Sequence, residues 1–230
     1  MTSREAENQH ILATLAGLVD SFNRAMPGPS EVVLHDLAKL PDSIVAIAGS
    51  LTGRAVGGPA TDMLLRAQSA GRLATRIGYE TSLEDGRLLR SSTLIVTNSA
   101  DEPVAALCIN SDVTMWRTLH EVSRAMLPGA RWPGELPDQS ADPVPADAER
   151  FVHDIDELAE ALLRQTIGAV GVPIDLMQKK HKLAVVADLK DRGFFMLKES
   201  IERAAGALLV SRFTIYNYLN ELDAEAEPGD

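Results

Sequence analysis

Apolar residues recur at helical spacing near the start of the chain and again in its last third. In residues 3–26 they repeat every three to four positions, and Pro27-Gly28-Pro29 ends the run. This pattern predicts a helix that covers a core or pairs with a partner chain. Residues 148–168 and 175–192 show the same period and predict two further helices.

Between these helices, short runs rich in β-branched residues predict strands. Pro59 suits the first turn of a helix that ends near Ala70, and Asp112 can cap a helix from about Val113 to Met126. Tight loops at 84–86 and 100–102 join consecutive strands, which requires antiparallel pairing. The result is an α+β fold, a PAS-like five-stranded antiparallel sheet with flanking helices. The predicted strands are 31–37, 43–48, 75–83, 88–97 and 103–110.

A helix-turn-helix is predicted over residues 197–222. Ser211 is a good N-cap, and the residues behind it give the second helix one apolar face: Ile215, Tyr218, Leu219 and Leu222. Alanines 204 and 205 let the two helices approach closely. The alternative is an ordinary amphipathic helical hairpin. Leu209 occupies the corner where glycine is usual, so it accepts strain or the turn differs.

Composition then sets the domain organisation and narrows the function. Residues 127–147 carry five prolines and predict a linker between a sensor domain, 1–126, and an all-α DNA-binding domain, 148–230. The net charge of −11 argues against DNA binding until it is divided, because residues 178–220 hold eight basic and four acidic side chains, a net +4. No membrane-spanning run, signal peptide or disulfide framework occurs, and Cys108 is interpreted as a core residue. We therefore expect a cytoplasmic protein.

The second helix of the predicted helix-turn-helix presents groups that contact DNA. Arg212 and Asn217 suit base edges, whereas Ser211 and Thr214 suit phosphates near the helix start. Local packing is the alternative for the aromatic members, and simple solvation is the alternative for the lysines. The predicted DNA-binding residues are Ser211, Arg212, Phe213, Thr214, Tyr216, Asn217, Asn220, Lys198 and Lys180.

Polar residues that interrupt the apolar strands predict a ligand site in the first domain. A cationic amino acid would place its side chain on Asp36 or Asp62 and its carboxylate on Arg54 or Arg90. The alternative is that such residues only satisfy backbone groups at strand ends. The predicted ligand-binding residues are His35, Asp36, Arg54, Thr61, Asp62, Arg90, Ser92 and Asn110.

Catalysis finds no support in the sequence. The five histidines have no metal-ligand spacing, and no nucleophile elbow, P-loop or dinucleotide fingerprint occurs. We therefore predict no enzyme activity, no catalytic residue, no cofactor and no metal.

Two passages together resemble a known family. EVVLHDL, SIVAIAGSLTGRAVGGPATD, GRLLRSSTLIV and ALCINSDVT resemble the YheO-like PAS domain. KLAVVADLKDRGFFMLKESIERAAGALLVSRFTIYNYLNEL resembles the helix-turn-helix paired with that domain in the same regulators. The resemblance implies a bacterial transcriptional regulator, of the type that includes the D-arginine utilisation repressor.

The predicted function is a ligand-responsive, DNA-binding transcriptional regulator, most simply a repressor. Its partners would be a double-stranded operator, a small-molecule effector such as an amino acid, and a second copy of the chain, with no membrane. A dimer follows because one short recognition helix gives little affinity or specificity. The alternative is a PAS-type interaction or dimerisation module whose helical hairpin does not bind DNA.

Overall fold

A computed structural model describes residues 3–126 and 154–226, which fall into two compact units. The first unit holds the sheet and the second holds most of the helices. No helix in the described part of the chain is both long and apolar enough to cross a membrane. The sheet unit comprises 3–36, 45–56 and 75–126, and the helical unit comprises 37–44, 57–74 and 154–226.

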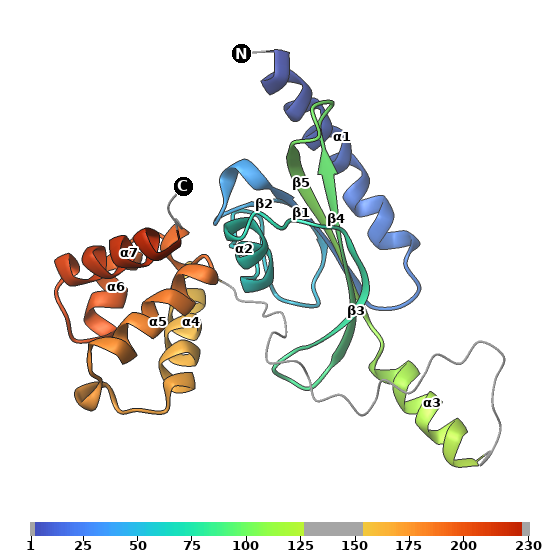
Figure 1. Cartoon of the computed structure of the whole chain (residues 1–230). Coiled ribbons are helices and arrows are strands. Elements are labelled where there is room, and N and C mark those ends of the chain that lie inside the picture. Colours follow the sequence, from blue (N-terminus) through green and yellow to red (C-terminus); the bar gives the residue numbers. More distant parts are fainter. Residues whose placement is uncertain (1–2, 127–153, 227–230) are drawn as a thin grey trace. The chain divides into compact units, whose positions relative to one another are not determined.

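The sheet has five strands in the order β2-β1-β5-β4-β3 (Figure 1). β1 pairs with β5, β5 with β4 and β4 with β3, each antiparallel. The predicted α+β sheet is therefore confirmed, with strand ends within two residues of the expected ones. The strands are β1 (Ser30–Asp36), β2 (Ile44–Gly49), β3 (Arg76–Ser82), β4 (Leu88–Thr97) and β5 (Pro103–Asp112).

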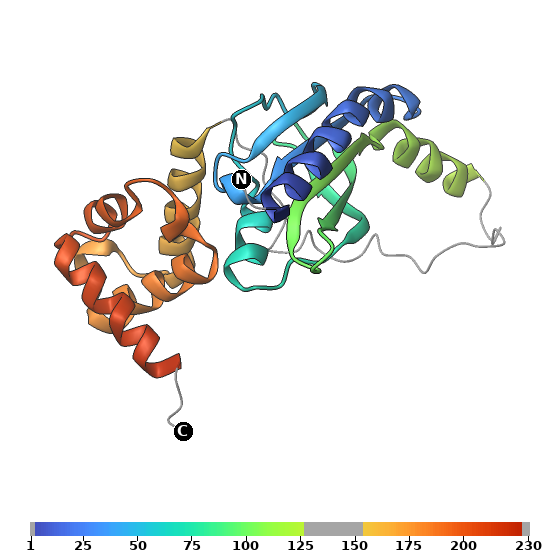
Figure 2. The ribbon, with the colours of Figure 1, turned by 90° about the horizontal axis from the view of Figure 1, so that it is seen from above.

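Helix α1 (Ser3–Ala25) covers one face of the sheet, which confirms the prediction of a core-covering helix. It runs along the strands, and Figure 2 shows it lying over them. Val19 of α1 packs on Val32 and Leu34 of β1 and on Ala105 and Leu107 of β5. Because strand side chains alternate between faces, the residues that lie between these four along β1 and β5 point to the opposite face of the sheet.

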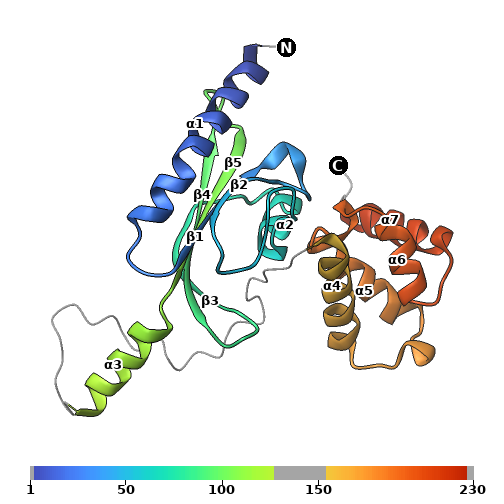
Figure 3. The same ribbon diagram turned by 180° about the vertical axis from the view of Figure 1, so that it is seen from behind.

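Two further helices flank the strands in sequence. α2 (Asp62–Ser69) begins three residues later than Pro59 suggested, because Thr61 caps it: Thr61 Oγ1 accepts from Leu64 N at 3.4 Å. α3 (Thr114–Met126) follows β5, and the Asp112 carboxylate accepts from Thr114 N at 2.9 Å, as predicted. In Figure 3, α3 leads away from the end of the sheet.

The helical unit contains α4 (Ile155–Val170), α5 (Lys179–Asp191), α6 (Ser200–Ala207) and α7 (Arg212–Ala226). Single 3₁₀ turns at Ile174–Leu176 and Phe194–Met196 connect them. α2 belongs to this unit and lies beside α5, where Ser69 Oγ donates to Lys190 O at 3.1 Å. The core includes Leu158, Leu162, Val185, Val186, Leu189, Phe194, Leu208 and Ile215.

The predicted linker 127–147 and the predicted helical residues 148–153 lie outside the described residues. The boundaries of the predicted domains therefore stay a prediction. What the compact units add is that residues 37–44 and 57–74, which lie inside the predicted sensor domain, cluster with the C-terminal helices.

Candidate nucleic-acid interface and candidate sensor site

The turn between α6 and α7 fixes the direction of α7, the second helix of the predicted helix-turn-helix. Val210 N donates to Ala205 O at 3.0 Å and Leu209 N donates to Gly206 O at 3.3 Å, the two bonds of a Schellman helix end. This motif needs a left-handed residue at its corner, and Leu209 supplies it with φ +51°. Of the two possibilities left by the sequence, Leu209 therefore accepts the strained conformation.

Ser211 then starts α7 as the predicted N-cap, because its Oγ accepts from Thr214 N at 3.1 Å. Ile215 is fully buried and Tyr218 nearly so, which fixes the inner face of the helix. Phe213 is 72% exposed and Tyr216 is 54% exposed, so neither side chain is buried by the residues that the structure describes. The outward face of α7 consists of Ser211, Arg212, Phe213, Tyr216, Asn217 and Asn220.

Charge on this surface is partly paired. Arg212 Nη1 donates to Glu202 Oε1 of α6 at 2.9 Å. The hydrogen bond from Arg212 lowers the pKa of Glu202, and the same bond raises the pKa of Arg212. Lys180 and Lys198 are exposed and have no ion-pair partner among the described residues. A DNA phosphate or base would therefore compete with Glu202 for Arg212.

The sheet has a second face, opposite α1, with a different character. Glu31 of β1 lies opposite Asn110 of β5, and Asn110 lies opposite Ser91 of β4. The next row places Thr93 opposite Cys108. We call this surface the polar sheet face; its buried polar members are Glu31, His35, Thr81, Ser91, Thr93, Cys108 and Asn110.

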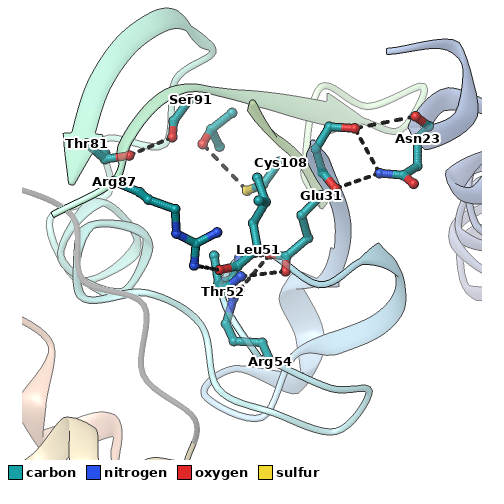
Figure 4. Close-up of polar contacts among 11 residues, drawn as sticks. Asn23, Glu31, Leu51, Thr52, Arg54, Thr81, Arg87, Ser91 and Cys108 are labelled. Atoms are coloured by element: carbon teal, nitrogen blue, oxygen red, sulfur yellow. Dashed lines mark hydrogen bonds and ion pairs between the residues drawn. The ribbon is translucent and has the colours of Figure 1, made fainter. Parts of the chain in front are cut away.

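Hydrogen bonds run across this polar sheet face. Thr81 Oγ1 and Ser91 Oγ lie 2.8 Å apart, and Thr93 Oγ1 lies 3.5 Å from Cys108 Sγ (Figure 4). Tyr79 extends the network, because its hydroxyl lies 2.8 Å from Thr93 Oγ1. Burial confirms Cys108 as an interior residue. Polar groups that are removed from water cost free energy unless they are bonded, so this network offsets much of that cost.

A buried ion pair closes the network on the β1 side. Arg54 Nη2 donates to Glu31 Oε1 at 3.1 Å, and both side chains are almost fully buried, 1% and 0% exposed. Thr52 holds the same carboxylate, through its N at 3.0 Å and its Oγ1 at 2.6 Å (Figure 4). A buried pair of this kind adds little net stability, since desolvation opposes the attraction.

Two predicted ligand residues lie on the polar sheet face itself. Burial, and secondarily the charge of Arg54, lowers the pKa of His35 to about 3, so its imidazole is neutral at pH 7. Asn110 is 1% exposed, and its Nδ2 donates to no group in the described part of the chain. The polar sheet face thus holds a neutral imidazole, an amide donor and a paired Glu–Arg.

The other predicted ligand residues lie elsewhere or serve local structure. Ser92 points to the opposite face from Ser91, and its Oγ accepts from Gly78 N at 3.0 Å. Arg90 is exposed and packs against Gly78. Asp36 is buried but alternates onto the face that α1 covers. Thr61 and Asp62 belong to the helical unit, where both bond to backbone N–H groups at the start of α2.

The predicted ligand-binding residues do not include Glu31, Thr52, Ser91 or Thr93, which also lie in this network. One signal was present: Glu31 and His35 are four residues apart in a run that otherwise reads as a strand, so both face the same side. Nothing in one sequence tells which of two adjacent serines faces inward, because that depends on strand register.

The sheet order, the covering helix and the helix-turn-helix define the class of the protein: a DNA-binding transcriptional regulator with a PAS domain. The family model of the YheO-like PAS domain matches residues 6–128, and the model of an HTH domain matches residues 158–220. The chain belongs to the YheO-like PAS-domain family of regulators.

Individual relatives agree with this assignment. The chain is 30% identical over 195 residues to the transcriptional regulator DauR of Pseudomonas aeruginosa, covering 84% of this chain and 85% of DauR. It is 26% identical over 215 residues to YheO of Escherichia coli (strain K12), covering 92% and 84% of the two chains. An uncharacterised protein of Haemophilus influenzae is 24% identical over 223 residues, covering 96% and 95%.

Proposed function

We propose that the protein is a cytoplasmic repressor that binds a small polar metabolite at the polar sheet face and binds its operator as a homodimer. The observation that carries the ligand part is the buried amide of Asn110, whose Nδ2 has no acceptor among the described groups. A buried donor without an acceptor costs about 1–3 kcal/mol, which a ligand oxygen would recover.

The chemistry of the polar sheet face favours a ligand that both donates and accepts hydrogen bonds. A ligand carboxylate can take a share of Arg54, and a ligand ammonium can take a share of Glu31. Neutral His35 can serve as a donor or an acceptor. An amino acid, for example arginine, meets these requirements, with Glu31 in the role that the sequence suggested for Asp36 or Asp62.

A conformational change at the ligand site could reach the DNA-binding helices through α2. The chain runs from Arg54 through residues 55–61 into α2, whose Leu65 carbonyl faces the backbone of Gly193 just after α5. A ligand that displaces Arg54 from Glu31 would change the end of that segment. The protein would then have two conformations with different affinities for the operator. The ligand would shift the population toward the conformation that it binds more tightly.

DNA binding is tested by fluorescence anisotropy of a labelled duplex from the region upstream of the protein's own gene. The titration uses excess unrelated DNA as competitor and several salt concentrations. Arg212→Ala should weaken binding and reduce the slope of log affinity against log salt by about one. Glu202→Gln should strengthen binding, since it releases Arg212 and removes a negative charge from the surface. Wild-type binding that unrelated DNA competes away would contradict the proposal.

Ligand binding is tested by titration calorimetry, with D- and L-arginine as the first probes of an amino-acid panel. Asn110→Ala should lower affinity about 5–150-fold, because the variant loses the roughly 1–3 kcal/mol that the ligand oxygen recovers at this amide. Ser92→Ala is the matched control, because Ser92 lies on the neighbouring strand but points away from Asn110. Equal losses in the two variants would place the ligand elsewhere.

The second candidate function is a protein-interaction module that does not bind DNA. The exposed apolar side chains of α3 favour an interaction surface, and the salt titration separates the two functions. An interaction module would give no competitor-resistant DNA complex, and Arg212→Ala would then change nothing.

A further inference from the structure

Helix α3 presents an apolar face that nothing in the described part of the chain covers. None of its 13 residues is buried, although it carries five large apolar side chains. Their exposed fractions run from 53% for Leu119 to 75% for Met126. A polar surface helix has no need of such side chains, and a helix of this length is barely stable in water without packing.

The apolar residues follow the spacing of a coiled-coil seam. Met115, Leu119, Val122 and Met126 are separated by four, three and four residues, which places them at alternating d and a positions. Such a pattern gives a narrow stripe along one side of the helix, suited to a second helix. Trp116 extends the stripe at its first turn.

The sheet holds α3 in a fixed direction. Leu88 N donates to Thr114 Oγ1 at 2.9 Å. Arg117 Nη1 donates to both oxygens of Glu80 at 2.7 and 2.8 Å. These contacts anchor the first turn to β3 and β4, and the rest of the helix leads away from the sheet (Figure 3). A short seam that is already positioned loses less conformational freedom when it pairs.

The charge pattern around the seam fits an identical partner. The positions that flank it are Trp116, Thr118, Ser123 and Ala125, all uncharged. The charged residues of α3, Arg117, Glu121 and Arg124, fall on the opposite side. Two copies of a chain with net charge −11 repel each other in general, but seam against seam they bring no like charges together.

We propose that α3 of one copy packs along α3 of a second copy, so that this seam is the dimer interface of the sheet unit. The inference deepens the proposed function, on which its biological purpose rests: a dimer presents two recognition helices to half-sites about 34 Å apart or a multiple of that.

The test is sedimentation velocity of the full chain at micromolar concentration, with circular dichroism to confirm folding. The wild type should sediment with an apparent mass twice the 24.8 kDa of one chain. Leu119→Lys and Val122→Lys should each raise the dimer dissociation constant about 100-fold or more, because each dimer would then carry two lysines in place of packed apolar side chains. His120→Lys, the same new charge next to the seam residue Leu119 but off the seam, should leave the dimer intact.

A monomeric wild type would overturn the inference, and so would folded seam variants that sediment as the wild type does. A wild type that dimerises through Leu119 but binds no operator would refute the proposed function and leave the interface in place. Specific operator binding together with a dimer that is insensitive to Leu119→Lys and Val122→Lys would refute the interface alone.

Discussion

Two glycines of the helical unit allow the contact between α2 and α5 to be measured. Gly193 ends the turn after α5 with φ +73°, and Gly171 ends α4 with φ +67°. A methyl group on Gly193 would lie 2.9 Å from Leu65 O and 3.2 Å from Leu65 C, both backbone atoms of α2. A methyl group on Gly171 would meet nothing within 4 Å. The two positions therefore share the backbone strain and differ only in the clash.

Backbone strain and steric clash together give the expected loss of stability for each variant. An alanine in the left-handed conformation costs about 1 kcal/mol relative to glycine, and this applies to both sites. At Gly193 the methyl also forces a carbonyl of α2 to move, and overpacking of this kind costs about 1–3 kcal/mol more. Gly171→Ala should thus destabilise the helical unit by about 1 kcal/mol and Gly193→Ala by about 2–4 kcal/mol.

Urea unfolding followed by far-ultraviolet circular dichroism gives the free energies, and hydrogen exchange gives their location. In Gly193→Ala the amides of α2 should lose protection, because the helix must move off α5 or rotate on it. In Gly171→Ala they should not. Free energies of unfolding that agree within about 0.5 kcal/mol for the two variants, with α2 equally protected, would show that α2 does not pack on this turn.

Three further predictions concern strain, titration and the buried ion pair. Leu209→Gly should stabilise the helical unit by about 0.5–1 kcal/mol in urea unfolding, because Leu209 is left-handed and 69% exposed; an unchanged or lower value would argue against strain there. His35 has a folded-state pKa below its unfolded value, so its contribution is full above about pH 6.5 and falls as pH drops toward 3. Between pH 6.5 and 5 the wild type should therefore lose about 1.6 kcal/mol of stability that His35→Gln does not lose, and parallel pH profiles would contradict this. Glu31→Gln should cost about 3 kcal/mol or more by leaving Arg54 buried without its counter-charge, and adding Arg54→Met should recover much of that; no recovery would mean that Arg54 is not the cause.

The two adjacent serines of β4 show where sequence reasoning stops. The strand itself was predicted with the correct ends, because five runs of β-branched residues separated by short loops leave few alternatives. The sequence suggested Ser92 for the ligand site, whereas Ser91 faces Asn110 and Thr81. A shift of one residue exchanges the two faces of a strand, and only the pairing with β5 fixes which face is which.

At the helix-turn-helix, by contrast, interactions between residues close in sequence are sufficient to predict the local structure. Ser211 caps α7, Ile215 and Tyr218 face inward, and Leu209 takes the corner, all from interactions within a few residues. The packing of α2 on the helical unit could not be predicted in the same way. It depends on contacts between segments more than a hundred residues apart, for which a single sequence carries no signal.

The division of the chain bears on how a ligand would control DNA binding. Residues 127–147, the predicted proline-rich linker, connect the two predicted domains, and the sequence alone suggests that coupling between them must pass there. Yet the chain also crosses between the two compact units after Asp36, Ile44, Val56 and Ala74. The predicted sensor domain therefore contributes one of its helices, α2, to the compact unit that holds α7.

If α2 transmits the effect of ligand binding to operator binding, the predicted linker serves only to hold the two domains together. Inserting four Gly-Ser residues within 127–147 should then leave the ligand-induced change in operator affinity within about 2-fold of the wild-type change, since doubling a flexible loop adds only about 0.6 kcal/mol of closure cost. Gly193→Ala should reduce the same ligand-induced change while operator binding without ligand persists. Anisotropy titrations with and without ligand measure both. The opposite pattern, a response lost on insertion and retained in Gly193→Ala, would assign the coupling to the linker, and α2 would then be a packing element alone.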